Sequence, residues 1–268
     1  MLPAAPVNLV DDKRQHLGRF SGPPQHVNLI DAAYHHLPRP LRRLRLKEWQ
    51  AVQLGSPGVF VCLALFDAKL MSLMQAKIYD HERGTKIIHE WKLRPGAFKV
   101  ADQLIDSTTR HADKRGSLEF RNELGAGRIT ITLDLHATKD LPAITGTVVM
   151  HTDRGASHVG SLPFAGDVGM YSHKGMFPID GELVVGDRTF PLKPTDSLGL
   201  LDDHKGFYPY VMRWDWVTSA QVVAGEACGF NLTRNQCRDP DQFNENCAWR
   251  GDALGTLPAV EFTREHER

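Results

Sequence analysis

The 268-residue chain lacks an excess of either charge, because 32 Lys and Arg residues balance 32 Asp and Glu residues. Proteins dedicated to nucleic acids or anionic membranes use surplus positive charge against phosphate, so this balance argues against both kinds of partner. The longest apolar run, residues 58–66, falls far short of the roughly 18 residues that a membrane-spanning helix needs. The first residues show no basic segment followed by an apolar core. We therefore expect no transmembrane segment, no secretory signal and a cytoplasmic location.

Sequence motifs for the common cofactor and hydrolase sites are also missing. The chain has no G-x-S-x-G nucleophile motif, no glycine-rich phosphate loop and no H-E-x-x-H metal motif. Asp202, Asp203 and His204 have metal-binding chemistry, but no second pair of such residues accompanies them at a recognisable spacing. We expect neither a metal nor an organic cofactor. The four cysteines form no C-x-x-C pair and are expected to be buried structural thiols; they are Cys62, Cys228, Cys237 and Cys247.

Short strand-type segments separated by turns occupy the chain from Trp49 onward. Apolar and polar residues alternate strictly over residues 128–136, which favours a strand over a helix. Residues 116–121 alternate in the same way, so Ala126 and Gly127 are expected to lie between two hairpin strands. The apolar run over residues 59–66 predicts a strand buried on both faces. This pattern is typical of an all-β protein.

Two further features complete the expected secondary structure. Gly186 and Asp187 separate two strand-type segments and predict a tight hairpin turn. Residues 67–75 are the one segment with helical spacing, and they predict a helical turn or two. The basic stretch from His35 to Lys47 contains no aromatic residues placed to stack on bases, so a solvated face is expected there.

The polar composition changes along the chain and suggests three parts. We expect an irregular leader over residues 1–40, a first β-barrel-like half over residues 41–152, and a second half over residues 153–268. The seam between the halves is placed in the polar, small-residue stretch 151–157.

Charged and aromatic residues share the strand-type segments between residues 171 and 249. In the segment 212–217, alternation directs Trp214 and Trp216 to one face and Arg213 and Asp215 to the other. In the segment 226–232, the small residue Gly229 leaves room for a ligand or a neighbouring backbone. Any single polar residue in these segments is more often part of a satisfied hydrogen-bond network than a catalytic residue.

Several blocks of the second half occur in an order that resembles the bacterial DUF2804 family, and the likeness extends over residues 40–262. The resemblance implies a lipocalin-like (calycin-type) antiparallel β-barrel or sandwich, with two barrel-like halves around an apolar ligand cavity. At the level of fold, such proteins are comparable with carotenoid 1,2-hydratase, tocopherol cyclase and the AttH group. The blocks are residues 171–174, 201–210, 213–216, 229–232 and 244–246.

Two functions follow as hypotheses, and both expect a hydrophobic small molecule as partner. The first is a cofactor-free hydratase, cyclase or isomerase for an isoprenoid- or lipid-like substrate, in which a carboxyl kept protonated by an apolar cavity donates a proton and aromatic faces stabilise a cation. The second is a carrier or sensor that uses the same cavity without reaction. A structural protein whose cavities are packed shut is a third hypothesis. The candidate catalytic residues are Asp203, Asp215 and Glu245, with Arg213 as an orienting charge. The candidate ligand-binding residues are Tyr171, Tyr208, Trp214 and Trp216 as aromatic faces, and His173, Lys174, Asn231 and Asn246 as orienting groups.

Overall fold

Period-two alternation builds the main sheet. We describe residues 2–164 and 168–265 from a computed structural model. In β10 (Arg128–Leu135), the apolar side chains of Ile129, Ile131 and Leu133 are buried, and the polar residues between them face outward. The same alternation recurs on the neighbouring strands, so the sheet has one continuous apolar face. The expectation of an all-β fold with an antiparallel sheet is confirmed.

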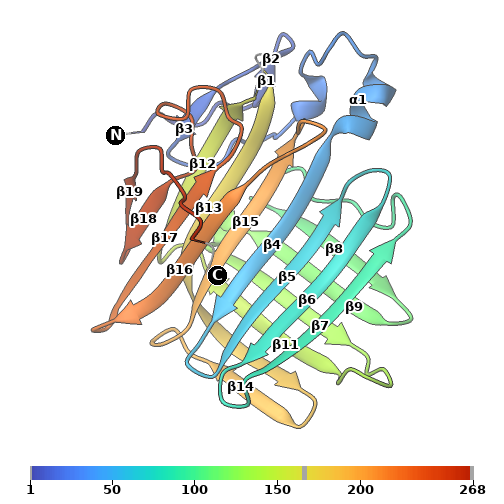
Figure 1. Ribbon diagram of the computed structural model, residues 1–268, viewed down its shortest axis with the longest axis vertical. Coiled ribbons are helices and arrows are strands. Elements are labelled where there is room, and N and C mark those ends of the chain that lie inside the picture. Colours follow the sequence, from blue (N-terminus) through green and yellow to red (C-terminus); the bar gives the residue numbers. More distant parts are fainter. Residues whose placement is uncertain (1, 165–167, 266–268) are drawn as a thin grey trace.

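The largest sheet has thirteen strands, and it curls so that its two wings face each other across one core (Figure 1). The front wing is β4 (Lys47–Gly55), β5 (Val59–Asp67), β6 (Ser72–Asp80) and β7 (Thr85–Leu93). The other wing is β8 (Ser107–Asp113), β9 (Gly116–Glu123), β10 and β11 (Ile144–His151), with the short helix η2 (Leu124–Ala126) between β9 and β10.

Two strands in the middle of the sheet connect the wings. They are β13 (Gly169–Val185) and β15 (Leu198–Gly206), which pair with each other from Met170 to Pro178. The first half of β13 also pairs with β12 (Ala156–Pro163), and its second half pairs with β11 and with β14 (Arg188–Leu192). β15 pairs on its other side with β4. The boundary predicted between residues 152 and 153 falls in the β11–β12 turn and stays a prediction.

Separate elements cover the two faces of the β13–β15 pair. A four-stranded sheet packs on one face through Met176, Leu200 and Trp249. It consists of β16 (Asp215–Val223), β17 (Glu226–Arg234), β18 (Cys247–Arg250) and β19 (Ala253–Thr256). The N-terminal segment packs on the opposite face against Tyr171 and Phe207. It contains β1 (Val10–Asp11), β2 (Arg14–Gln15), β3 (Gly18–Phe20), η1 (Leu29–Asp31) and α1 (Arg39–Arg45).

Several expectations about single segments are wrong. β5 is fully buried on one face only: Phe60 on the other face is 40% exposed, and Cys62, Ala64 and Phe66 beside it are half-buried. Residues 67–75 form the β5–β6 hairpin and not a helical turn, since Met74 alternates into the core and Lys69 takes a left-handed turn conformation. The leader contains three short strands. The strand predicted over residues 212–217 begins only at Asp215.

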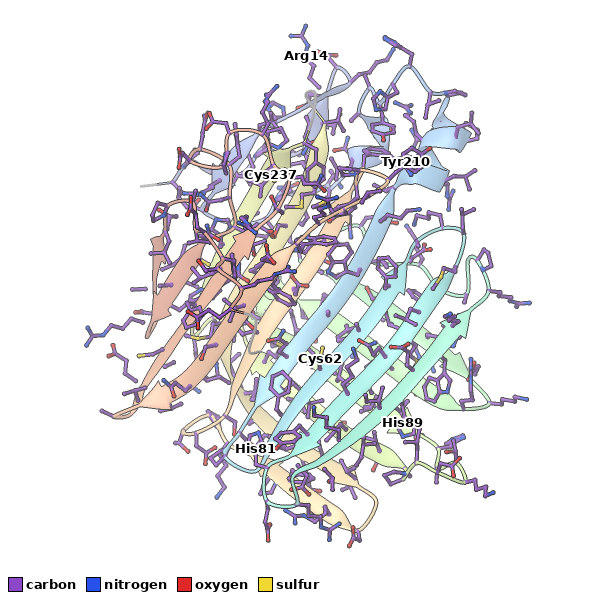
Figure 2. All side chains as sticks on the ribbon, in the orientation of Figure 1. Arg14, Cys62, His81, His89, Tyr210 and Cys237 are labelled. Carbon is purple, nitrogen blue, oxygen red and sulfur yellow. The ribbon has the colours of Figure 1, made fainter. Side chains whose placement is uncertain are left out.

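The expected β9–β10 and β13–β14 hairpins are confirmed, and the second turns at Gly186 and Asp187. The cysteines are free, but only Cys237 and Cys247 are buried, while Cys62 and Cys228 are half-buried. Figure 2 places Cys62 on the front wing and Cys237 beside the four-stranded sheet, far apart in the molecule. Within the described residues, no helix has the length and apolar character to cross a membrane.

Candidate functional site

The β13–β15 pair carries polar side chains on both of its faces. Consecutive residues of a strand point to opposite sides, so the register sorts the polar residues of both strands into two groups. Ser172 and Lys174 lie opposite His204 and Asp202 on the face toward the four-stranded sheet. The other group lies on the opposite face and consists of Tyr171, His173, Asp203 and Lys205.

The first group forms an ionic cluster with Glu245, which lies in the connection between β17 and β18. Lys174 Nζ donates to Asp202 Oδ1, lies 3.6 Å from Glu245 Oε1 and lies 3.1 Å from His204 Nε2. His204 Nε2 is 3.0 Å from Asp202 Oδ1 and 3.3 Å from Glu245 Oε1. The hydroxyl of Ser172 donates to Glu245 Oε1. We call these five residues, Ser172, Lys174, Asp202, His204 and Glu245, the ionic cluster.

Two cations and two carboxylates balance within this cluster. Burial alone would raise the pKa of Glu245, but Lys174 and His204 lower it to about 2. The same neighbours hold the pKa of Asp202 far below its ordinary value, against the effect of burial. Burial would lower the pKa of His204, yet Asp202 raises it above 6.5 overall. Asp202 and Glu245 are therefore ionised at neutral pH beside the Lys174 ammonium, which removes the desolvation penalty of an unpaired charge.

Aromatic residues surround the ionic cluster. The indole of Trp49 stacks on the imidazole of His204, with ring centroids 4.5 Å apart, and its Nε1 donates to Asp202 Oδ2 at 3.0 Å. The hydroxyl of Tyr208 lies 3.2 Å from His204 Nδ1. Burial and Glu245 raise the pKa of Tyr208 well above its ordinary value, so its phenol keeps its proton. The Lys174 ammonium lies 5.1 Å from the ring centroid of Trp216.

A groove of 830 Å³ adjoins the ionic cluster on the outside of the molecule. Two of its lining residues contact the cluster or its aromatic surround. Asn235 Nδ2 donates to Glu245 Oε2 at 3.3 Å, and the Trp214 ring packs on Tyr208 with centroids 5.6 Å apart. The groove is lined by Met212, Arg213, Trp214, Asp215, Arg234, Asn235, Gln236, Phe262 and Arg264.

Three arginines and one aspartate give the groove positive charge. Asp215 accepts from both Arg234 and Arg264, which lower its pKa. The guanidinium of Arg213 makes no hydrogen bond or ion pair with another described residue, and it is exposed. Arg213 is thus free to bind an anionic or polar group of a ligand.

The group on the opposite face, Tyr171, His173, Asp203 and Lys205, is separated from the groove by the sheet. Burial raises the pKa of Asp203 to about 6, although Lys205 Nζ lies 3.9 Å from its Oδ1 and lowers it. Neither carboxylate oxygen of Asp203 has a hydrogen-bond partner among the described protein atoms, nor has Lys205 Nζ. Burial lowers the pKa of His173 to about 3, so its imidazole is neutral. The hydroxyl of Tyr171 is 3.3 Å from His173 Nδ1.

The predicted site residues consequently fall into separate places. Glu245, Lys174, Tyr208 and Trp216 lie at the ionic cluster, but Glu245 is ionised and is not the protonated acid that we expected. Arg213, Trp214 and Asp215 lie at the groove, where Asp215 is also ionised. Tyr171, His173 and Asp203 lie behind the sheet.

Asn231 and Asn246, two of the predicted ligand-binding residues, stabilise the connection between β17 and β18, in which Glu245 lies. Asn231 accepts from Trp216 Nε1 at 2.7 Å and donates to the Glu245 carbonyl at 2.8 Å. Asn246 accepts from the Thr233 backbone and donates to the Pro258 carbonyl. Both side chains are buried and bonded within the protein.

Sequence reasoning missed Ser172, Asp202, His204, Trp49 and Asn235 as parts of the site. The spacing of Asp202 and His204, two residues apart in a strand, was the available signal that both face one side. The space left by Gly229 is filled by the protein itself: a Cβ there would lie 2.6 Å from Met176 Sδ and from the Ser219 carbonyl.

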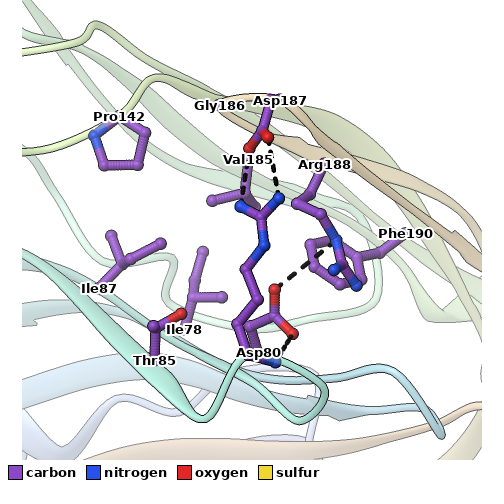
Figure 3. Close-up of a pocket in the computed structure, with 11 residues that line it drawn as sticks. Ile78, Asp80, Thr85, Ile87, Pro142, Val185, Gly186, Asp187, Arg188 and Phe190 are labelled. Atoms are coloured by element: carbon purple, nitrogen blue, oxygen red, sulfur yellow. Dashed lines mark hydrogen bonds and ion pairs between the residues drawn. The ribbon is translucent and has the colours of Figure 1, made fainter.

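A second cavity, of 210 Å³, lies at the far end of the curled sheet (Figure 3). Its walls include Ile78, Ile87 and Phe190. Arg83 makes two 2.9 Å hydrogen bonds to Asp187, and Arg188 lies 3.7 Å from Asp80. Because these charges are paired with one another, the cavity offers a ligand fewer free polar groups than the groove does.

Comparisons with known proteins identify the family. The crystal structure of kievitone hydratase from Nectria haematococca aligns with a TM-score of 0.49 and 13% identity, over 79% of this chain and 64% of that chain. This chain thus spans less than two-thirds of the length of that protein. A comparison with curated protein sequences finds no match. Residues 10–267 match the family described as "Domain of unknown function (DUF2804)", and the chain belongs to this family.

Proposed function

We propose that this protein catalyses proton transfer to an apolar small molecule bound in the groove, as a hydratase or isomerase. The observation that carries the proposal is the continuous chain from Tyr208 through His204 to Asp202 and Glu245, directly behind residues that line the groove. Groups buried, charged and linked in this way beside an open groove are typical of proton-transfer sites.

Tyr208 is the proton donor in this proposal. The proposal takes His204 as an imidazolium, with a hydrogen on each ring nitrogen, so that Nδ1 donates to the Tyr208 oxygen and Nε2 donates to the carboxylates. The hydroxyl hydrogen of Tyr208 then remains available to a substrate. When Tyr208 gives it up, the adjacent imidazolium stabilises the phenolate that forms.

The reaction balances without another reactant besides water. Tyr208 protonates one carbon of a polarised double bond, and water adds to the other carbon. The proton lost by that water returns to the Tyr208 phenolate, so the net change is addition of water. An isomerase uses the same donor but removes a proton from a neighbouring carbon instead of adding water.

The groove supplies the ligand contacts. Trp214 and Phe262 offer apolar and aromatic surface, while Arg213 offers an unpaired positive charge. This combination favours an amphipathic molecule with a hydrocarbon body and an anionic or polar end. Trp214 packs on Tyr208 from the groove side, so a rotation of its ring would admit the reacting carbon to the phenol.

The experiment is solvent isotope incorporation. Wild type and Tyr208→Phe are incubated in D₂O with a panel of amphipathic alkenes and α,β-unsaturated carbonyl compounds. Mass spectrometry then measures the mass increase of the products. We expect wild type to add deuterium or D₂O to at least one compound, and Tyr208→Phe to be at least about 100-fold slower while still binding it. Tyr79→Phe, on the outer face of β6, is the matched control. Binding of the compounds without any incorporation by wild type would favour the carrier hypothesis instead.

A further inference from the structure

The basic stretch of the sequence forms an amphipathic end of the molecule. Residues Arg39–Arg45 make up α1, in which no side chain is buried. Leu41 and Leu44 are 47% and 45% exposed, and their spacing of three residues puts them on one face of the helix. Apolar side chains of this size are normally withdrawn from water when the fold provides a place for them.

Two further segments bring exposed apolar residues to the same end. The β5–β6 turn contributes Leu70, which is 70% exposed, and the connection after β15 contributes Tyr210, which is 89% exposed, and Val211. Lys47 Nζ donates to the Leu44 carbonyl at 3.0 Å and to the Ala68 carbonyl, which ties α1 to the turn.

The connection after β15 is tied to α1 as well. The Arg45 guanidinium lies 3.9 Å from the ring centroid of Tyr210, and Figure 2 shows Tyr210 beside the helix. We call the five exposed apolar residues the apical surface; they are Leu41, Leu44, Leu70, Tyr210 and Val211.

Positive charge surrounds this surface although the whole chain is neutral. Residues 35–47 contain no Asp or Glu. Arg39 is neutralised by Asp31, and in the neighbouring turn Lys69 is neutralised by Glu48 and Asp67. The remaining cations form no ion pair with a carboxylate of the described residues, although Asp67 acts on Lys47 from a longer distance; they are Arg42, Arg43, Arg45 and Lys47.

We propose that the apical surface docks on an anionic lipid membrane, with its apolar side chains in the headgroup region and the surrounding cations, exposed Arg43 foremost, against lipid phosphates. Leucine side chains gain free energy at the acyl boundary, and a tyrosine suits the interface. A nucleic acid would use the cations but would give the leucines no apolar environment. A net charge of zero is compatible with this docking, because it averages over the whole chain, whereas these cations lie at one end of the molecule. This docking does not depend on the proposed reaction.

The test is co-sedimentation of the full chain with vesicles of phosphatidylcholine alone, and with vesicles that also contain phosphatidylglycerol. We expect binding to the mixed vesicles only, weakening as salt is raised. Arg43→Gln is expected to weaken binding about fivefold. The double variant Leu41→Ser and Leu70→Ser is expected to weaken it at least about tenfold.

Matched variants elsewhere on the surface control for folding and charge. Lys139→Gln and Ile88→Ser remove an exposed cation and an exposed apolar side chain far from α1, and they are expected to bind like wild type. Thermal unfolding of all variants checks that each is folded. The proposal is overturned if the wild-type protein stays in the supernatant with both kinds of vesicle, or if it binds both kinds equally. It is overturned as well if the protein binds RNA but not the mixed vesicles. It is also overturned if the apical variants bind as the controls do.

Discussion

His204 Nδ1 lies 3.2 Å from the hydroxyl of Tyr208, at a point where both rings are buried. The other nitrogen of His204 faces two ionised carboxylates, so the imidazole links a phenol to a negative environment. Burial and Glu245 raise the pKa of Tyr208, so in the proposed reaction the Nδ1 hydrogen of His204 must stabilise the phenolate that forms when the proton leaves.

The groove is expected to bind amphipathic anions through Arg213 and Trp214. With 1-anilinonaphthalene-8-sulfonate as a probe, Arg213→Gln should weaken binding about threefold, because one exposed charge contact is lost. Trp214→Ala should weaken it further, because an aromatic wall is removed. Arg154→Gln is the control, since Arg154 is exposed and does not line the groove. Fluorescence titration measures the affinities, and equal affinity in all four proteins would show that the probe binds elsewhere.

Lys174 is expected to be essential for stability. Lys174→Met leaves Asp202 and Glu245 with one cation between them, so the free energy of unfolding should fall by about 3–5 kcal/mol. Urea denaturation measures it, and Lys86→Met on an exposed position should change it by less than about 0.5 kcal/mol.

The loss of stability in Lys174→Met should come from the unbalanced charge of the ionic cluster, and not only from the lost contacts of Lys174. Adding Glu245→Gln to Lys174→Met leaves Asp202 paired with His204, so the double variant should be less destabilised than the sum of the single variants. Strict additivity would contradict the balanced cluster.

Asp203 should make stability depend on pH. Its pKa in the folded protein is about 6, above its ordinary 3.8, so the folded state holds this proton more tightly than the unfolded state does. Its contribution is complete below the ordinary value and is lost as pH rises toward 6, amounting to about 3 kcal/mol. Buried His158 and His173 have lowered pKa values, so their effect on the free energy of unfolding increases with pH and opposes that of Asp203. The quantity to measure is therefore the difference in the free energy of unfolding between a variant and wild type.

The comparison is Asp203→Asn against wild type. Relative to wild type, the variant should gain stability between about pH 4 and pH 6, measured by urea denaturation at each pH. A difference that stays constant over this range would mean that Asp203 ionises normally.

Gly229 should be needed for the packing of the four-stranded sheet on β13. A Cβ at this position would lie 2.6 Å from the Ser219 carbonyl, which is backbone and cannot rotate away. Gly229→Ala is therefore expected to lower the free energy of unfolding by about 1–3 kcal/mol. Gly255→Ala in β19 is the control, because a Cβ there meets no atom within 4 Å. Equal thermal midpoints for the two variants would contradict the tight contact.

Much of the fold was predictable because alternation and turn residues are local signals. The period of β10 and the Gly186–Asp187 turn identify strands without knowledge of their partners. The segment 67–75 was mispredicted because its spacing also fits a helix, and pairing with β5 decides between the two.

The candidate site was predictable only in part. The alternation of side chains along a strand predicts that Asp203 and His204 point to opposite faces of the sheet. It does not predict which of the two points toward the groove. That choice depends on what packs on each side of β15, and the four-stranded sheet comes later in the chain. Glu245 lies in an irregular connection, where no periodicity indicates its direction.

The protonation of His204 tests the account most directly. Imidazole ¹⁵N chemical shifts, assigned by comparison with His204→Gln, report whether one or both ring nitrogens carry hydrogen as pH is raised. We expect His204 to remain doubly protonated at pH 7, because Asp202 raises its pKa against the effect of burial and the proposed reaction needs the imidazolium. A neutral His204 imidazole at pH 7 would contradict the ionised cluster and the proposed role of Tyr208.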